Sequence, residues 1–157
     1  MKPPRTVAAC ALWLLLGCGY APVRRAAARG VRVGAVRNAT AQAEAGGVFA
    51  SAVRSELSGR GQLDGDGADS PELIVEVLAL QSVPTSSAGE GAASYRLDAD
   101  LKLDVGTWQD RFRASEDYIA GMDVLGTEAN RRAALRRLAR NAMRDAIERY
   151  DVAQRLK

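Results

Sequence analysis

The chain has 157 residues, of which 47% are apolar, and this is enough for one domain with one hydrophobic core. It contains no histidine, which excludes histidine triads, histidine general bases and histidine-ligated zinc. There are 22 basic and 19 acidic residues; removing residues 1–17 takes away Lys2 and Arg5 and leaves 20 against 19, a formal charge of +1. The basic pI of the whole chain therefore says little about nucleic acid, and we expect no nucleic-acid partner.

The N-terminal segment contains an apolar run that stops at a cysteine. The run from Val7 to Leu16 follows two basic residues, has the length of a signal-peptide core and is too short to span a bilayer. It leads through the letters LLGC to Cys18, the pattern of a bacterial lipoprotein cleavage site. We therefore expect diacylglycerol and an N-acyl lipid on Cys18, and no other cofactor. The alternative is a plain signal peptide with an incidental cysteine.

This pattern divides the chain into three segments. Residues 1–17 are the expected lipoprotein signal peptide, residues 18–29 the lipidated tether, and residues 30–157 the folded domain. Gly19 follows the cysteine where an aspartate would favour retention at the inner membrane, so the outer membrane is the expected location. Because Cys10 leaves with the signal and Cys18 carries lipid, the domain is expected to have no disulfide and no cysteine-ligated zinc.

The first half of the domain reads as strand, helix, strand. The letters VRVGAVRN alternate from Val31 and break step near Ala35, and apolar spacing predicts a helix from about Glu44 to Ser58. The stretch GQLDGDGADSP resembles part of a calcium loop, but the position that needs a carboxylate is Val75, so we interpret it as a polar turn. LIVEVLAL then predicts a central strand covered on much of both faces, and PTSSAGEGAAS predicts a flexible loop.

The second half predicts a hairpin and a long helix. Apolar and charged residues alternate from Tyr95 to Val105, a tight connection follows, and WQDRFRASEDY forms the next strand. Thr127 is the expected N-cap of the helix. Its apolar stripe comprises Leu135, Leu138, Ala139, Ala142, Ala146, Tyr150, Ala153 and Leu156. The expected core comprises Leu101, Leu103, Trp108, Leu135, Leu138, Ala142 and Ile147.

The element order is strand, helix, strand, strand, strand, helix. Each helix has one apolar stripe, and the most regular strand is apolar on one side and polar on the other. We therefore predict an α/β (α+β) two-layer sandwich, in which two helices pack on one face of a four-stranded mixed sheet in the order βαβββα. The other face of the sheet stays polar.

These features together resemble the LPS-assembly lipoprotein family, LptE, also called RlpB. The resemblance rests on a cleavage site ending in GCGY, a first strand closing in VRNAT, a dense apolar strand, a tyrosine-led hairpin and a long terminal helix. It implies a non-enzymatic outer-membrane lipoprotein that occupies the lumen of the LptD β-barrel. Such a protein would assist barrel assembly and the transport of lipopolysaccharide to the cell surface.

The polar sheet face is the candidate barrel-facing surface, with Lys102 and Arg111 as its leading residues. A barrel lumen is lined by polar side chains that could pair with these charges. Alternating charge of this kind also occurs on ordinary solvated surfaces, so both interpretations stay open. The full set comprises Arg96, Asp98, Asp100, Lys102, Gln109, Arg111 and Arg113.

A second candidate site is one end of the sheet, opposite the tether. With a parallel first crossover, the exits of the first, second and fourth strands and the start of the last helix lie at that end. Arginines there suit the phosphates of lipid A, the ligand that the resemblance implies. The candidates are Arg37, Arg96, Arg113, Arg131 and Arg132, and the rival is the exposed helix row Arg137, Arg140 and Arg144.

Two other classes of protein remain as alternatives. One is another small outer-membrane lipoprotein, such as a secretin pilot or an envelope scaffold. The remote one is a lipid-anchored hydrolase, which would need a carboxylate or serine site. The carboxylates of this chain fall mainly on exposed strand positions and solvated helix faces.

Overall fold

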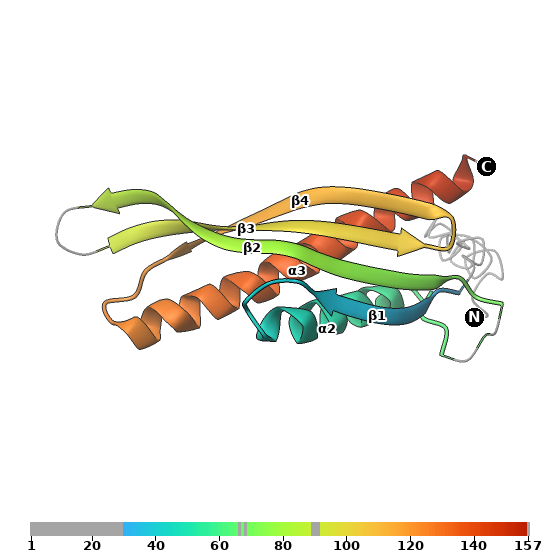
Figure 1. Cartoon of the computed structure of the whole chain (residues 1–157), viewed down its shortest axis with the longest axis horizontal. Coiled ribbons are helices and arrows are strands. Elements are labelled where there is room, and N and C mark those ends of the chain that lie inside the picture. The colour runs from blue at the N-terminus through green and yellow to red at the C-terminus, as the bar shows by residue number, and fades with distance from the viewer. Residues whose placement is uncertain (1–29, 66, 68, 89–91, 157) are drawn as a thin grey trace, which may run out of the picture.

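A four-stranded sheet and two helices make up the domain (Figure 1). The structure is a computed structural model of the chain, and it describes residues 30–65, 67, 69–88 and 92–156. The predicted signal peptide, Cys18 and the tether therefore lie outside the described residues. The elements are β1 (Arg32–Asn38), α2 (Glu44–Gly59), β2 (Glu72–Ala88), β3 (Ala92–Val105), β4 (Trp108–Ile119) and α3 (Val124–Arg155).

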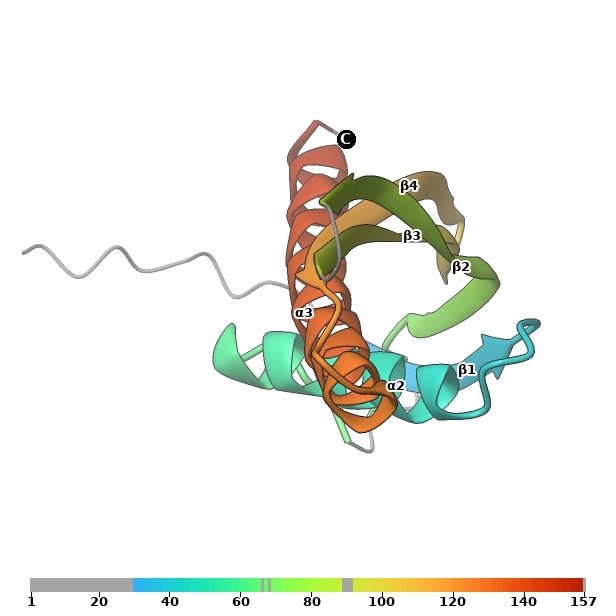
Figure 2. The ribbon, with the colours of Figure 1, turned by 90° about the vertical axis from the view of Figure 1, so that its left-hand side faces the viewer.

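The predicted fold class is confirmed. The strands lie in the order β1-β2-β3-β4, with β1 parallel to β2 and the other neighbours antiparallel. Both helices lie on one face of the sheet, and no helix or strand of the described residues covers the opposite face, which we call the open face (Figure 2). The core between the layers includes Phe49, Leu57, Leu97, Leu101, Leu103, Leu135, Leu138, Met143 and Ile147.

The local patterns of β1 and α2 predict these elements well. The expected break in β1 is a register shift between Val33 and Val36 in its pairing with β2. Helix α2 begins at the predicted Glu44 and ends one residue later than predicted, at Gly59. Its buried residues recur at helical spacing, because one stripe of the helix packs on the sheet.

Strand β2 differs from the prediction in two respects. Leu73, Val75 and Val77 are buried, but Ile74 on the open face is only half-buried, so the strand is covered on one face instead of on much of both. The predicted loop over residues 84–94 is also wrong, because β2 continues to Ala88 and β3 begins at Ala92. Strands β2 and β3 stay paired as far as Ala88 and Ala92, with register shifts on the way, although the Ser- and Gly-rich composition of this segment is typical of a loop.

The N-cap of helix α3 lies four residues before the predicted cap, Thr127. The N-cap is Asp123, whose Oδ1 accepts a hydrogen bond of 2.6 Å from the Gly126 backbone N–H. The Thr127 hydroxyl instead donates to the Asp123 carbonyl and accepts a 3.0 Å bond from the Gly121 N–H. The connection is thus tied to the first turn of the helix.

The predicted core and helix stripe need two corrections. Trp108 is half-buried instead of buried, because it lies on the edge strand and contacts Tyr150 edge-on, with ring centroids 5.5 Å apart. The stripe of α3 is buried as far as Tyr150, but Ala153 is only half-buried and Leu156 is 83% exposed. The last turn of α3 runs past the sheet (Figure 1), and its contacts there include hydrogen bonds that Asp151 accepts from Arg60 and Gln62 after α2.

Candidate functional site

The open face places the two barrel-facing candidates directly opposite each other. Lys102 on β3 and Arg111 on β4 are register partners, and like charges at such positions repel. Lys102 Nζ lies 2.9 Å from Asp104 Oδ2, while Arg111 is exposed. Glu76 on β2 is the register partner of Lys102 on its other side. The centre of the open face thus carries both signs of charge, with Arg111 as its exposed basic residue.

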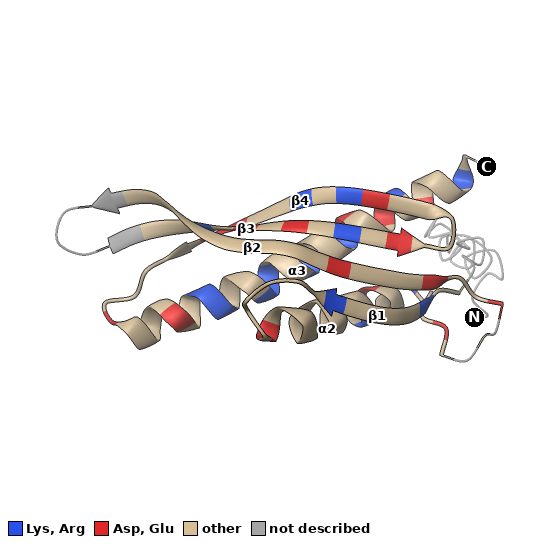
Figure 3. Ribbon diagram, viewed as in Figure 1, with Lys and Arg blue, Asp and Glu red and all other residues tan. Residues whose placement is uncertain are grey.

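Two other arginines of the open face pair across the same two strands. Arg96 Nε lies 3.2 Å from Asp117 Oδ1, and Arg113 Nε lies 2.8 Å from Asp100 Oδ1. Both pairs are solvated, and the Arg113 side chain is 87% exposed. Exposed pairs of this kind contribute about 0–1 kcal/mol each, so these guanidinium groups stay available to an anionic ligand. Figure 3 shows this charge along β3 and β4.

Arg131 and Arg132 lie elsewhere, on the helix layer. Arg131 donates to both carboxylate oxygens of Glu128, to Glu44 Oε1 at 2.6 Å and to Gln42. It therefore ties α3 to the start of α2. The hydrogen bond from Arg131 lowers the pKa of Glu128 to about 2, and the same bond raises the pKa of Arg131.

Arg132 is the more accessible of the two. Its Nε lies 3.0 Å from Glu128 Oε1 and 3.5 Å from Glu44 Oε2, and its side chain is 57% exposed. Arg131, by contrast, has a side chain only 18% exposed. The charge of Arg131 is used within the fold, whereas Arg132 can also face a ligand.

The structure does not gather the five predicted arginines into one cluster. Arg37 lies next to Glu76 in the register, and β1 ends at Asn38 beside Val77, whereas β2 continues to Ala88. Because the strands differ in length, the exit of β1 lies partway along β2 and not at its end (Figure 1). Three candidates lie on the sheet, Arg37, Arg96 and Arg113, and two lie on α3, Arg131 and Arg132.

The rival helix row is partly committed to the fold. Arg137 Nε lies 2.6 Å from Glu116 Oε1 of β4, and Arg149 makes an equivalent pair with Asp110 at 2.9 Å. These two acidic side chains belong to the set that faces α3, so they join the edge strand to the helix. Arg140 is exposed, which leaves it as a solvated residue of the row.

Sequence reasoning missed an apolar surface at one end of the domain. Four large apolar side chains between the end of β4 and the first turn of α3 are exposed: Ile119 by 63%, Met122 by 106%, Val124 by 83% and Leu125 by 82%. We call residues 119–127 the distal turn. Four large apolar residues within the seven positions 119–125 were the available signal. The predicted helix start at Thr127 left this segment unassigned.

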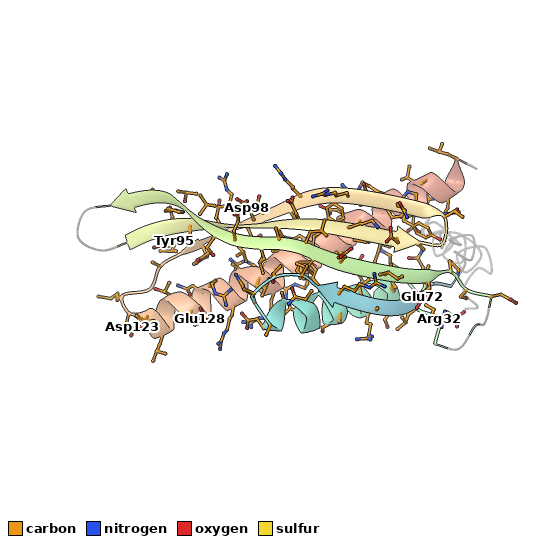
Figure 4. All side chains as sticks on the ribbon, in the orientation of Figure 1. Arg32, Glu72, Tyr95, Asp98, Asp123 and Glu128 are labelled. Atoms are coloured by element: carbon orange, nitrogen blue, oxygen red, sulfur yellow. The ribbon has the colours of Figure 1, made fainter. Side chains whose placement is uncertain are left out.

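The distal turn lies at the end of the domain away from Gly30, where the tether would join. Figure 4 labels Asp123 and Glu128 near the distal turn, and Arg32 and Glu72 at the opposite end. Arg32 Nη2 lies 3.7 Å from Glu72 Oε2, which marks the first residues of β1 and β2 as neighbours. We call these two ends the distal end and the tether end.

Known proteins provide the assignment to a family. The sequence profile of the LptE family, described as lipopolysaccharide-assembly, matches residues 28–150. The chain belongs to this family. No curated protein sequence matches the chain. The family confirms the resemblance to lipopolysaccharide-assembly lipoproteins that the sequence motifs indicate.

Solved structures support the LptE fold. Rare lipoprotein B from Shewanella oneidensis superposes with a TM-score of 0.52 at 11% identity, over 80% of this chain and 96% of that chain. A lipoprotein candidate from Caulobacter crescentus superposes with a TM-score of 0.50 at 16% identity, over 77% of this chain and 89% of that chain. At such identities the likeness concerns the fold. Neither helix of the described residues is long and apolar enough to cross a membrane.

Proposed function

We propose that this LptE-family protein is an outer-membrane lipoprotein that pairs with an LptD-type β-barrel and assists lipopolysaccharide insertion. The observation that carries the proposal is the family match over residues 28–150. A sheet face that is charged and uncovered among the described residues agrees with it, because a barrel lumen offers polar side chains to such a face. In this proposal the protein acts as a scaffold and a ligand chaperone, without catalysis.

The anchor in this proposal is lipid on Cys18. Twelve residues, 18–29, separate the anchor from the described domain, and an extended chain of that length spans at most about 40 Å. The tether joins at Gly30, so the tether end lies nearer the leaflet that holds the lipid. Acyl chains on one cysteine hold a protein firmly, because each buried methylene contributes about 0.8 kcal/mol.

The barrel contact is assigned to the centre of the open face. Lys102 and Arg111 repel each other in the free protein, so an acidic side chain of the barrel wall would relieve the repulsion on binding. Charge reversal at both positions should therefore weaken the complex. The matched control is charge reversal at Arg136 and Arg140, two exposed arginines of α3.

The test is purification of the lipoprotein from its native membrane, followed by identification of what co-purifies. Recovery of an LptD-type barrel with the wild type and the control, and reduced recovery with the Lys102→Glu, Arg111→Glu variant, is the expected result. A secretin ring in place of the barrel would support the pilot-protein alternative. Unchanged recovery with the double variant would remove the open face from the interface.

The lipopolysaccharide contact is assigned first to the accessible arginines. Arg132 and Arg113 have the most exposed side chains among the ion-paired candidates, at 57% and 87%. A guanidinium group can bind a phosphate through two charge-assisted hydrogen bonds. Arg132→Glu and Arg113→Glu, made singly, should each lower the affinity for lipopolysaccharide. Arg131→Glu is a poor probe, because it would also break the contact between α2 and α3.

A further inference from the structure

The C-terminal part of α3 carries a groove whose apolar side chains stay exposed within the described domain. Val152 is 50% exposed and Leu156 is 83% exposed, and the four-residue spacing places both on one side of the helix. A contiguous apolar surface on a folded protein indicates a contact with another segment or molecule. We call this surface the α3 groove. It is lined by Asp145, Glu148, Arg149, Val152, Ala153 and Leu156.

The charge that the α3 groove offers to a partner is acidic. Arg149 Nε lies 2.9 Å from Asp110 Oδ2 of β4, so this positive charge is used within the fold. Glu148 is exposed, and no ion pair among the described residues involves it. Asp145 lies 3.8 Å from Arg144, and both side chains are more than half exposed. The groove therefore suits a segment that is both apolar and basic.

The tether joins the domain beside this groove. The Val31 N–H donates a 2.7 Å hydrogen bond to the Gln62 carbonyl, and the Gln62 side chain donates a 2.8 Å bond to Asp151, the residue before Val152. Gly30, where the described residues begin, therefore lies close to the last turns of α3. In Figure 1 the start of β1 and the last turns of α3 lie at the same end of the domain.

The tether has the composition that such a groove requires. Tyr20 and Val23 are apolar, and Arg24 and Arg25 follow them directly. Six steps of chain join Arg24 to Gly30, and an extended chain of that length spans about 20 Å. The tether can therefore cross the last turns of α3 and bring its arginines to the acidic part of the groove.

The order of side chains along the tether also fits the groove. Glu148 and Leu156 are eight positions apart, which is about 12 Å along the helix. Arg24 and Tyr20 are four positions apart, which is about 13 Å in an extended chain. With Arg24 beside Glu148, an extended tether therefore brings Tyr20 to Leu156.

We propose that the α3 groove binds the tether of the same chain, with Val23 and Tyr20 against Val152 and Leu156, and the tether arginines beside Glu148. The inference rests on the proposed function only for the lipid on the anchor cysteine. Docking leaves two tether residues between the groove and the lipid, a span of about 7 Å instead of about 40 Å. The tether end of the domain is then held at the surface of the anchoring leaflet.

The first experiment measures disulfide formation in the mature lipoprotein within its native membrane. Because Cys10 leaves with the signal and Cys18 carries lipid, introduced cysteines should be the only thiols. Val23→Cys with Val152→Cys should form a disulfide at least about tenfold faster than Val23→Cys with Thr107→Cys. Thr107 is the matched control, because it is exposed in the turn between β3 and β4 at the same end of the domain.

Equal rates for the two pairs would show that the tether does not select the groove, and this would overturn the inference. The single Val152→Cys variant separates that result from a failure of the proposed anchor. A disulfide between the introduced thiol and Cys18 would mean that Cys18 carries no lipid, so the anchor would be wrong. The groove contact would then be decided by the same comparison with Thr107→Cys, made as a single variant.

The second experiment measures trypsin cleavage after the tether arginines in the purified lipoprotein, because a bound segment is protected from the protease. The Val152→Ser, Leu156→Ser variant should be cut about fivefold faster than the wild type, since serine removes apolar area without adding charge. The matched control, Met122→Ser with Leu125→Ser, makes equivalent changes at the distal end and should be cut at the wild-type rate. All four side chains are 50% exposed or more, so both variants should fold.

The outcomes separate the tether from other occupants of the groove. Cleavage of the Val152→Ser, Leu156→Ser variant at the wild-type rate would overturn the inference. If that variant also lost the barrel, the groove would be a protein interface instead of a tether site. If the wild type recovers no barrel but both rates are as expected, the proposed function is wrong and the tether contact stands.

Discussion

Replacement of Leu138 by alanine tests how α3 packs on the sheet. Leu138 lies near the middle of the helix and is 1% exposed. Removing a buried leucine side chain to its Cβ costs about 2–5 kcal/mol, from the lost transfer free energy and the cavity left behind. Leucine and alanine have similar helix propensities, so the change acts mainly through packing.

The surroundings of Leu138 narrow this range. Leu138 lines a hollow of about 250 Å³ between β4 and α3, together with Phe112 and Ala142, so one of its sides has fewer neighbours. We therefore expect Leu138→Ala to cost about 2–3 kcal/mol, the lower half of the range. Leu135 is 0% exposed and does not line the hollow, so Leu135→Ala should cost more, about 3–5 kcal/mol.

The assay is unfolding by urea and by heat of a soluble form that begins at residue 19, with circular dichroism as the signal in both. A loss of 2–3 kcal/mol corresponds to a decrease in Tm of about 6–15 °C for a domain of this size. Leu156→Ala, at the C-cap of the same helix, is the control, and it should stay within about 0.5 kcal/mol of the wild type, because Leu156 is 83% exposed. An unchanged Leu138→Ala protein would mean that this stripe of α3 faces a partner instead of the sheet.

Three further outcomes are expected. Cys18→Ala should leave a precursor of unprocessed mass, whereas cleavage elsewhere in the wild type, with no added acyl mass, would exclude lipidation. Glu128→Gln should destabilise the protein at neutral pH, because the pKa of Glu128 is lower in the folded protein than in the unfolded chain and its ionised form therefore stabilises the fold. The difference in stability between variant and wild type should shrink as the pH falls from 4.5 toward 2, and a difference independent of pH would contradict this. Gly121→Ala should cost about 1–3 kcal/mol, because its Cβ would meet the backbone of Gly126 at 2.7 Å, whereas Gly47→Ala has nothing within 4 Å and should be neutral or stabilising; equal melts would refute the close approach.

The sequence by itself determined the elements whose pattern is local. The alternation from Tyr95 to Val105 settles which side chains of β3 face the helices, because successive residues of a strand point to opposite faces. Apolar spacing places α2 within one residue of its observed bounds, for the same kind of reason. The element order then restricts the layers to one economical arrangement, with both helices on one face of the sheet.

Only the tertiary structure decided which arginines are committed to the fold. Arg131 meets Glu44 from a position 87 residues away, and this contact depends on how far α3 is rotated and shifted over α2. Arg132, the next residue, is left 57% exposed by the same placement. Periodicity assigns side chains to a face but does not fix the offset between two elements, so the sequence cannot separate these two arginines.

The distal turn shows the same division between local and tertiary information. The sequence contains an aspartate three residues before Gly126, but Thr127 is also a suitable cap by residue type. The choice of Asp123 follows from the close approach of Gly121 to Gly126, which brings the end of β4 against the first turn of α3. That approach is a contact between two elements, and it determines where α3 begins and which apolar side chains the connection leaves exposed.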